Sequence, residues 1–523
     1  MKVSTFIQLF IYSQIVYANF FVQLKNPATL EQLLANDDKV TASNHHIRGL
    51  VENVISFGNF TGFSGHFHRD VIKRLLKSPM VLNIVRDVPI KVFDHENLDD
   101  TTHYNYSDEA IETEPHDNSG YQSTEFETQF MAPRHLARLS RRSTLPYNES
   151  VNYYYDPRFL GQDVNAYIID TGIHSEHPDF EGRVILSKDF TMFRKRGDQS
   201  GHGTHVAGLV GSKTFGVAKK VNLIDLKALG SHGEGTLSTV LSALQFAVTH
   251  RQESGAKGVV NLSLGSFKND VLNSAIDNAV ESGLVVVVAA GNFGSDSCLS
   301  SPASASRAIS VGAIDDRNDK IAKFSNWGQC VHVFGSGIGV HSVSHVSETQ
   351  SMELSGTSMS SPVIAGLAAV LLSKGIEPND IKSLIIEMST HGSIIGSING
   401  SPNHIAYNGV YKSDDTFPED AFWSEDTHGP VFQPLYKNAM VPSLNSQEYA
   451  QKDIDGWARY LSQINPSAMS VLFGAEEDED DEGDETKFYD EDVHTDFNLQ
   501  VESLVNEDGD LALLYDDEYV SKE

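Results

Sequence analysis

One serine, Ser358, lies between small residues in the stretch SGTSMSSP (355–362), just before an apolar run that is typical of a buried helix. A hydroxyl at a helix N-terminus lies where backbone N–H groups converge and the macrodipole favours negative charge. Such a position suits a nucleophile and the oxyanion that its attack creates. The alternative is an ordinary helix cap, because Ser, Thr and Gly are common N-cap residues. The choice depends on whether the chain also supplies a base, an orienting acid and a second oxyanion donor.

A carboxylate that could orient such a base is Asp170, which ends the apolar run VNAYIID and precedes Thr171-Gly172. Active sites of α/β sheets lie at the carboxyl ends of parallel strands, which is where this side chain is expected. A turn-forming aspartate is the structural alternative. An aspartic protease is excluded, because that mechanism needs two carboxylates sharing a proton and the sequence has no second D-T-G or D-S-G.

The candidate base is His202, in the stretch GHGTHVAGLVGS (201–212). His202 and His205 are three residues apart, which could indicate zinc, but a third ligand and an acidic partner are missing nearby. Glycines on both sides at a helix start place His202 in a cleft, where it can accept a hydroxyl proton. His205 is expected to be structural. Asn292, at the end of LVVVVAAGN, is either a turn residue or a side-chain donor to the oxyanion, together with the Ser358 backbone N–H.

The elements that must position these residues form an alternating pattern between 133 and 412. Continuous apolar runs such as VNAYIID, GVVNLSL and LVVVVAA alternate with helical stretches. This pattern predicts an α/β fold with parallel strands covered by helices on both faces. Upstream, strand-like and helix-like segments alternate as a small β-α-β-β-α-β unit. The predicted parts are a signal peptide (1–18), an α+β domain (19–93), a polar, cleavable linker (94–132), the α/β domain (133–412) and an acidic tail (413–523).

The N-terminal segment and the distribution of charge predict a secreted protein with an acidic tail. Lys2 followed by a mostly apolar run to Ala18 predicts a secretory signal peptide, and no later stretch is long and apolar enough to span a membrane. The net charge is −32, and 413–523 holds 30 acidic and 5 basic residues, so the tail is expected to be disordered. The absence of a comparable basic stripe disfavours nucleic-acid binding, so no nucleic-acid partner is expected.

Secretion also makes covalent modification an expectation. Four N-x-S/T sequons are expected to carry glycans, namely Asn59, Asn105, Asn148 and Asn399. Asn261 also lies in a sequon, but its apolar strand predicts that it is buried and unmodified. The two cysteines, Cys298 and Cys330, are predicted to form a disulfide because the secretory route is oxidising; the alternative is two buried free thiols.

The order Asp, His, Ser and the motifs IIDTGI, HGTHVAG, SLGS, AAGN and GTSMSSP resemble a subtilisin-family serine endoprotease, or subtilase, of the proteinase K and cerevisin branch. The resemblance spans about 133–412, and the upstream unit resembles the inhibitory propeptide of that family. The stretches APRHLARLSRR and FSNWGQCV are similar to yeast subtilases associated with the spore wall. A subtilisin-like peptidase domain is therefore expected, made as a secreted zymogen that its own propeptide inhibits.

The resemblance assigns roles to the residues. Ser358 is the nucleophile, His202 the base, Asp170 the orienting acid and Asn292 the oxyanion donor. Two strands are expected to pair with an extended protein or peptide substrate, with broad, weakly apolar specificity. They carry Ser263, Leu264 and Gly265 on one side and Leu229, Gly230 and Ser231 on the other. No cofactor or metal is expected.

Two positions depart from the family pattern. Val363 follows Pro362 where the family usually has His, which concerns packing rather than catalysis. His332, two residues after Cys330, replaces an Asp that binds calcium in relatives similar to proteinase K, and it is a poor ligand for a hard cation. The rival hypotheses are a catalytically silent subtilase fold that acts as a structural wall component, and a zymogen whose propeptide never leaves.

Overall fold

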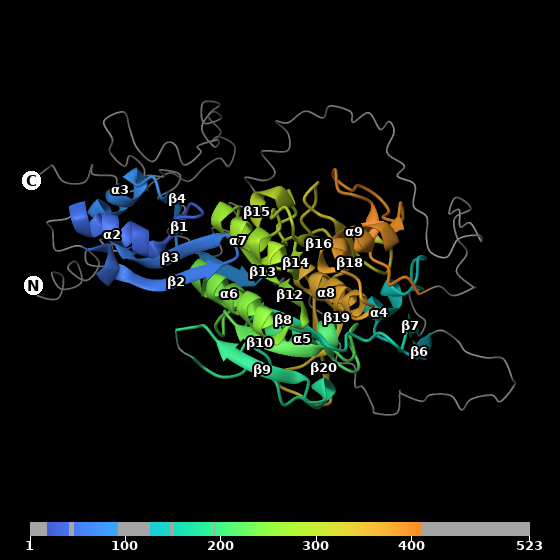
Figure 1. Ribbon diagram of the computed structural model, residues 1–523. Helices are drawn as coiled ribbons and strands as arrows, with labels where there is room; N and C mark the ends of the chain where they lie inside the picture. The colour runs from blue at the N-terminus through green and yellow to red at the C-terminus, as the bar shows by residue number, and fades with distance from the viewer. Residues whose placement is uncertain (1–17, 41–45, 93–125, 147–150, 193, 411–523) are drawn as a thin grey trace, which may run out of the picture. The chain divides into compact units, whose positions relative to one another are not determined.

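The computed structural model describes residues 18–40, 46–92, 126–146, 151–192 and 194–410 (Figure 1). The acidic tail, the predicted signal peptide up to residue 17 and most of the expected linker lie outside the described residues. Part of that linker is described and folded: β6 (Glu127–Gln129) pairs with β7 (Tyr153–Tyr155), and Ala132 is buried in the core. The sequence up to Ala132 is polar, so periodicity gave no indication of this short strand.

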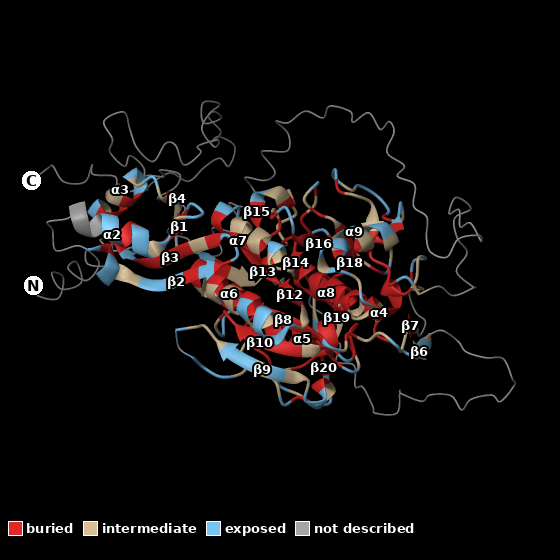
Figure 2. Cartoon of the chain, in the orientation of Figure 1, coloured by how far each residue is buried: buried red, intermediate tan, exposed pale blue. Residues whose placement is uncertain are grey.

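The centre of the chain is a ten-stranded, mostly parallel sheet. The apolar runs of the sequence form its middle strands, as predicted. In spatial order the strands are β21 (Thr390–His391), β22 (His404–Ile405), β18 (Val333–Ser336), β16 (Ile309–Asp315), β14 (Leu284–Ala289), β12 (Lys257–Leu262), β8 (Val164–Asp170), β10 (Asn222–Lys227) and β9 (Val184–Asp189), with β17 (Lys320–Ile321) beside β16. Burial on both faces explains why these strands are apolar without alternation, and the edge strand β9 is the most exposed (Figure 2).

Helices cover the two faces of this sheet, and β8 shows the division. Ala166 and Ile168 belong to one buried cluster, whereas Tyr167 and Ile169 belong to another, because successive side chains point to opposite faces. The helices of the first cluster are α4 (Arg134–Leu139), α5 (His202–Gly211), α8 (Thr357–Ser373) and α9 (Pro378–Met388), and those of the second are α6 (Leu237–Ser254) and α7 (Asp270–Glu281).

The N-terminal unit has the predicted β-α-β-β-α-β order and its own hydrophobic cluster. Its elements are β1 (Ala18–Leu24), α2 (Leu30–Val40), η1 (Ile47–Leu50), β2 (Val51–Phe57), β3 (Phe60–Phe67), α3 (Arg69–Lys77) and β4 (Val81–Arg86). The strands form an antiparallel sheet in the order β2-β3-β1-β4. The first and last strands of the unit, β1 and β4, are therefore neighbours in the sheet, with β4 at its edge.

A fifth strand of this segment, β5 (Pro89–Val92), leaves that sheet. It lies between β11 (Glu234–Thr236) and β13 (Leu264–Phe267) of the large domain and pairs antiparallel with both. β13 also pairs with β15 (Ser300–Ser301), which completes a four-stranded sheet. A second small sheet joins β19 (Val340–Val343) to β20 (Ser351–Leu354).

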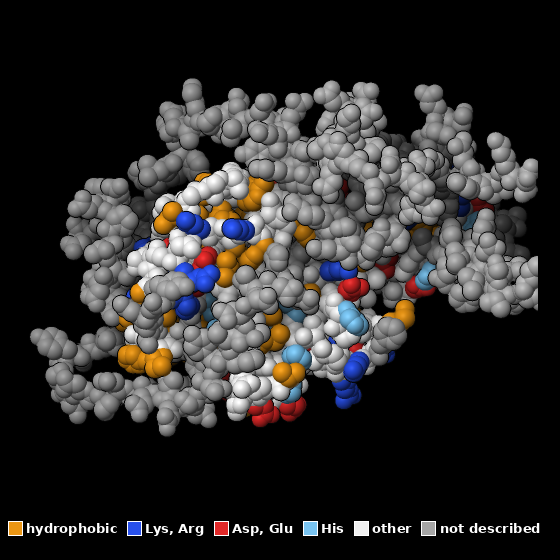
Figure 3. Space-filling view, turned by 180° about the vertical axis from the view of Figure 1, so that it is seen from behind, with side chains coloured by type: hydrophobic (Ala, Val, Ile, Leu, Met, Phe, Trp, Pro, Cys, Tyr) orange, Lys and Arg blue, Asp and Glu red, His pale blue; other side chains and the backbone are white. Residues whose placement is uncertain are grey.

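The described surface has mixed charge. On the face shown in Figure 3, Lys and Arg side chains stand in separate groups among acidic and neutral ones. Within the described ranges, no single helix combines the length and apolar character that a membrane span requires; α8 and α9 meet the requirement only as a pair, with a 119° bend between them.

Candidate active site

Asp170 and His202, far apart in sequence, are in direct contact at the carboxyl edge of the sheet. The His202 Nδ1 lies 2.6 Å from Asp170 Oδ1, and both side chains are about 1% exposed. The Thr171 backbone N–H donates to the same oxygen at 2.7 Å. A carboxylate at Nδ1 accepts the Nδ1–H, which leaves Nε2 as the basic nitrogen of the neutral ring.

The turn before α5 fixes where His202 starts its helix. Gly201 has a φ of +94°, and a Cβ added there would lie 2.3 Å from His345 Nδ1. Asp198 Oδ1 accepts hydrogen bonds from the Gly201 N–H (2.9 Å) and the Thr171 hydroxyl (2.9 Å). Its Oδ2 accepts from the Thr204 N–H and hydroxyl (2.9 and 2.7 Å). One carboxylate therefore ties the loop after β8 to the first turn of α5.

Ser358 lies in the first turn of α8 and is fully buried. Its Oγ donates to the Ser263 carbonyl oxygen at 3.2 Å, and the Ser263 hydroxyl donates back to the Ser358 carbonyl at 2.9 Å. Helices α5 and α8 pack against each other, so the helix starts that carry His202 and Ser358 belong to the same layer. Ser263, directly before β13, links this serine to the strand that pairs with β5.

The side-chain amide of Asn292 has a defined orientation. Its Oδ1 accepts hydrogen bonds from both the N–H and the hydroxyl of Thr357, at 2.9 and 2.8 Å. The Thr357 hydroxyl in turn accepts from the Gly291 N–H at 3.1 Å. Two donors identify this atom as the oxygen, so the NH₂ group is at the opposite end of the amide. Thr357 precedes Ser358, and the loop of Asn292 is thereby attached to the start of α8.

The two segments expected to bind an extended peptide flank β5. Leu264 and Gly265 pair with Val92 and Lys91, and β11 begins three residues after Ser231. The Gly230 N–H donates to the Glu234 carbonyl and closes the turn before β11. Leu229 is buried beneath this turn, and Ser231 is exposed. A strand of the N-terminal unit therefore lies between the segments that were predicted to hold substrate.

Comparison with known proteins gives the family. The profile of the Subtilase family matches residues 161–416. Subtilase-type proteinase RRT12 of Saccharomyces cerevisiae is 44% identical over 77% of this chain and 84% of its own length. The chain belongs to the subtilase family. Peptidase inhibitor I9 matches residues 21–93, so this subtilase carries an inhibitory propeptide domain before its peptidase domain.

Two further relatives are similar over most of the chain. A subtilase-type proteinase of Schizosaccharomyces pombe, isp6, is 35% identical over 71% of this chain and 74% of its own length. Cerevisin of Saccharomyces cerevisiae is 34% identical over 83% of this chain and 66% of its own length. The predicted subtilisin-like fold and the propeptide are thus confirmed, and the subtilase is a serine endopeptidase made as a zymogen.

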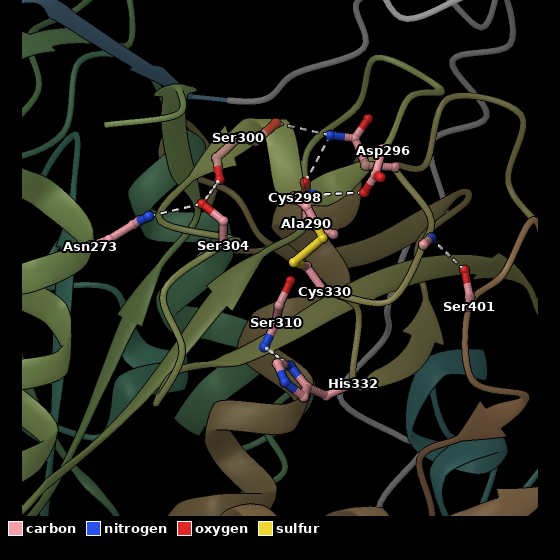
Figure 4. Close-up of a disulfide and its surroundings, with 12 residues drawn as sticks. Asn273, Ala290, Asp296, Cys298, Ser300, Ser304, Ser310, Cys330, His332 and Ser401 are labelled. Carbon is pink, nitrogen blue, oxygen red and sulfur yellow. Dashed lines mark hydrogen bonds between the residues drawn. A yellow bond between two sulfur atoms is a disulfide. The ribbon is translucent and has the colours of Figure 1, made fainter. Parts of the chain in front are cut away.

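The subtilase has a disulfide between Cys298 and Cys330 (Figure 4). It joins the loop after Asn292 to the segment that follows the FSNWG motif. Asn326 of that motif connects the same two segments: its Oδ1 accepts from the Phe293 N–H (3.0 Å) and its Nδ2 donates to the Ala290 carbonyl (2.9 Å). The loop that contains Asn292 is therefore held by a covalent bond and by a buried amide.

His332 does not fit the role of a calcium ligand. Its Nδ1 accepts the Ser310 backbone N–H at 3.0 Å, and burial lowers the pKa of its ring to about 3 (Figure 4). The side chain is neutral and already engaged, whereas calcium takes oxygen ligands. Among the described residues, no group of three or more His, Cys, Asp or Glu side chains is arranged to hold a metal ion.

The remaining predicted positions are distributed as follows. Asn261 is buried, as expected, and its Nδ2 donates to the Ser263 hydroxyl at 2.9 Å. Asn59 and Asn399 are exposed, and Asn105 and Asn148 lie outside the described residues. Val363 is buried within α8.

Sequence reasoning missed several polar residues that support the site. Two of them, Asp198 and Thr357, are described above. A third is the buried Lys227, whose Nζ donates a hydrogen bond to the Thr171 carbonyl oxygen. Asp225, two residues before Lys227 on β10, has its pKa raised to about 7 by burial. The clue available in the sequence was the position of Asp198, four residues before His202, together with polar residues in otherwise apolar β10. Neither clue specifies the partner, because the contacts span up to 56 residues of chain.

Proposed function

We propose that Ser358, His202 and Asp170 form the catalytic triad of this subtilase and that Asn292 supplies an oxyanion donor. The observation that carries the proposal is the buried contact between Asp170 and His202 Nδ1, at the edge where α8 presents Ser358. His202 Nε2 takes the proton of the Ser358 hydroxyl as Oγ attacks a peptide carbonyl. His202 then donates this proton to the leaving amine, while Asp170 stabilises the imidazolium. The acyl-enzyme is hydrolysed by water through the same groups.

The oxyanion of each tetrahedral intermediate lies between the Asn292 amide and the Ser358 backbone N–H. The contact of Asn292 Oδ1 with Thr357 supports this role, because its two hydrogen bonds hold the side chain in one rotamer and so orient the NH₂ group before substrate binds. Donors that are already oriented stabilise developing charge without reorganisation. The start of α8 adds its dipole to the same position.

The zymogen is proposed to process itself in the secretory pathway. β5 lies between β11 and β13, and its partner strand β13 adjoins Ser263, whose carbonyl accepts the Ser358 hydroxyl. The cut is expected at a bond between residues 93 and 127, because β6 and Ala132 are packed into the folded domain.

The mature enzyme is proposed to be secreted and to act in spore or cell wall assembly. The predicted signal peptide supports secretion. The Schizosaccharomyces pombe relative, named for a sexual differentiation process, supports a role in sporulation. A silent fold with a structural role in the wall is the alternative, and intact Asp170, His202, Ser358 and Asn292 argue against it.

Expression of wild type and Ser358→Ala in cells that lack other subtilases tests the proposal. The wild-type chain should yield a shorter form whose N-terminus lies between 94 and 127, whereas Ser358→Ala should accumulate as the uncut precursor. Ser360→Ala, two residues further along α8, is the matched control and should be processed. Normal maturation of Ser358→Ala would show that another protease makes the cut.

A further inference from the structure

We propose that Glu234 selects a basic side chain in the substrate, at the position that Lys91 occupies in the propeptide. This inference rests on the proposed function, because it concerns the groove that leads to Ser358. It assigns a charge preference to a site whose backbone pairing alone is tolerant of sequence.

The position of Lys91 is defined from both sides of β5. Lys91 pairs with Glu234 of β11 on one side and with Gly265 of β13 on the other. Its Nζ lies 2.5 Å from Glu234 Oε1. The Lys91 side chain is 19% exposed and that of Glu234 is 52% exposed, so the lysine is the more enclosed partner. On the other side Lys91 faces a glycine, which has no side chain to contribute.

The neighbours of Lys91 show that β5 is seated as a substrate strand would be. Ile90 is fully buried in the hydrophobic cluster that includes Leu229 and Leu264 of the peptidase domain. The Val92 N–H donates to the Gly233 carbonyl at 2.9 Å. Gly233 has a φ of +69°, and a Cβ there would lie 2.5 Å from Val92 Cγ2. The strand is therefore in close contact with β11 along its length.

The register places this position upstream of the bond that is cut. Val92 pairs with Leu264, and the residue before Leu264 is Ser263, whose carbonyl accepts the Ser358 hydroxyl. Lys91 is one residue further from the nucleophile than Val92, and Ile90 is one further still. The groove therefore takes an aliphatic side chain followed directly by a basic one, both on the N-terminal side of the scissile bond.

The strength of the preference follows from exposure. A partly exposed ion pair contributes between nothing and about 1 kcal/mol, so attraction to Glu234 alone gives a preference for Lys of up to about fivefold. Repulsion between Glu234 and an acidic substrate residue acts in the same direction. A stronger preference would need a buried ion pair, whereas the Glu234 side chain is exposed.

The test uses processed enzyme and two fluorogenic peptides built on the sequence of residues 88–93, VPIKVF and VPIEVF, each with the leaving group after Phe. Wild type should cleave the Lys peptide with a kcat/KM at least twofold higher than that for the Glu peptide. Glu234→Gln should bring the ratio towards one, and Glu234→Lys should invert it. Glu253→Lys, an exposed glutamate near the end of α6, makes the same charge change as the matched control and should leave the ratio unchanged.

The two ways of failing are distinguishable. The charge selection would be overturned if both peptides are cleaved and the ratio of their kcat/KM values is the same in wild type, Glu234→Gln and Glu234→Lys. The proposed function would remain intact in that case. Cleavage of neither peptide above the rate of Ser358→Ala would overturn the proposed function, and with it the selection.

Discussion

At the scale of single residues, the contact between Thr357 and Asn292 orients the amide that is proposed to stabilise the oxyanion. Asn292→Ala should lower kcat about 100-fold or more and leave KM nearly unchanged, because the lost hydrogen bond forms only after attack. Steady-state kinetics on a peptide amide measures both constants. Thr357→Ser keeps the N–H and the hydroxyl that orient the amide and should stay within a few-fold of wild type. A loss in kcat below tenfold for Asn292→Ala would remove this residue from the proposed mechanism.

A second group of residues, the buried neutral histidines, sets how stability depends on pH. His205 Nε2 donates to the Val340 carbonyl at 2.9 Å, and burial lowers the pKa of its ring to about 3. Burial also lowers the pKa of His135 to about 4 and that of His332 to about 3. Below pH 6.5 the unfolded chain binds protons that the folded chain does not. The free energy of unfolding is therefore highest above pH 6.5 and falls as the pH decreases towards 3.

Thermal unfolding between pH 7 and pH 4.5 tests this expectation. His205→Gln should lose less stability on acidification than wild type, by about 1.4 kcal/mol for each pH unit below 6.5. The glutamine amide retains a donor for the Val340 carbonyl but has no proton to gain. Asp225, whose pKa is raised to about 7 by burial, contributes the opposite slope, but equally in both proteins. Parallel curves for the two proteins would contradict the assignment of His205.

At the scale of elements, the loop after β14 is connected to the FSNWG segment by Asn326 and by the Cys298–Cys330 disulfide. With a sequence separation of 32 between its cysteines, the bond should contribute about 3–4 kcal/mol in the chain-entropy account. We expect the double variant Cys298→Ser/Cys330→Ser to lower the Tm of the mature enzyme by roughly 5–15 °C. EDTA should change the Tm little, because His332 is a neutral, engaged side chain.

Differential scanning calorimetry of wild type, with and without EDTA, and of the double serine variant compares the two contributions. Equal destabilisation by EDTA and by loss of the disulfide would mean that a metal site with other ligands holds this loop.

The elements also show what local sequence can and cannot specify. Asp170 and Asn292 follow long apolar runs, and His202 and Ser358 stand at glycine-marked helix starts, so hydrophobic pattern and turn residues predicted their places. The burial of Asn261 followed from the same pattern. β5 could not be predicted to leave its own sheet, because pairing with β11 and β13 depends on strands more than 130 residues away in sequence. The role of Asp198 was missed for a related reason: a carboxylate in a polar loop has no periodicity to reveal its partners.

At the scale of the whole molecule, one chain contains both an endopeptidase and the domain that covers its groove. The contact extends beyond β5: Asp87 accepts hydrogen bonds from the Ser238 N–H and hydroxyl at 2.8 and 2.7 Å, at the start of α6. A carboxylate is favourable at a helix N-terminus, so the propeptide stabilises an element of the enzyme that it inhibits. Under the proposed function, activity requires both the triad and departure of the propeptide.

The most direct test of the central claim is labelling of the processed protein with a fluorophosphonate, followed by identification of the modified peptide. The reagent reacts only with a serine activated by a neighbouring base, in a groove that the propeptide has left. We predict one label, on Ser358, with no labelling of the Ser358→Ala chain and strongly reduced labelling of His202→Ala, provided that each variant is first processed by an added protease. Absence of label from processed wild type, or a label on another serine, would contradict the account.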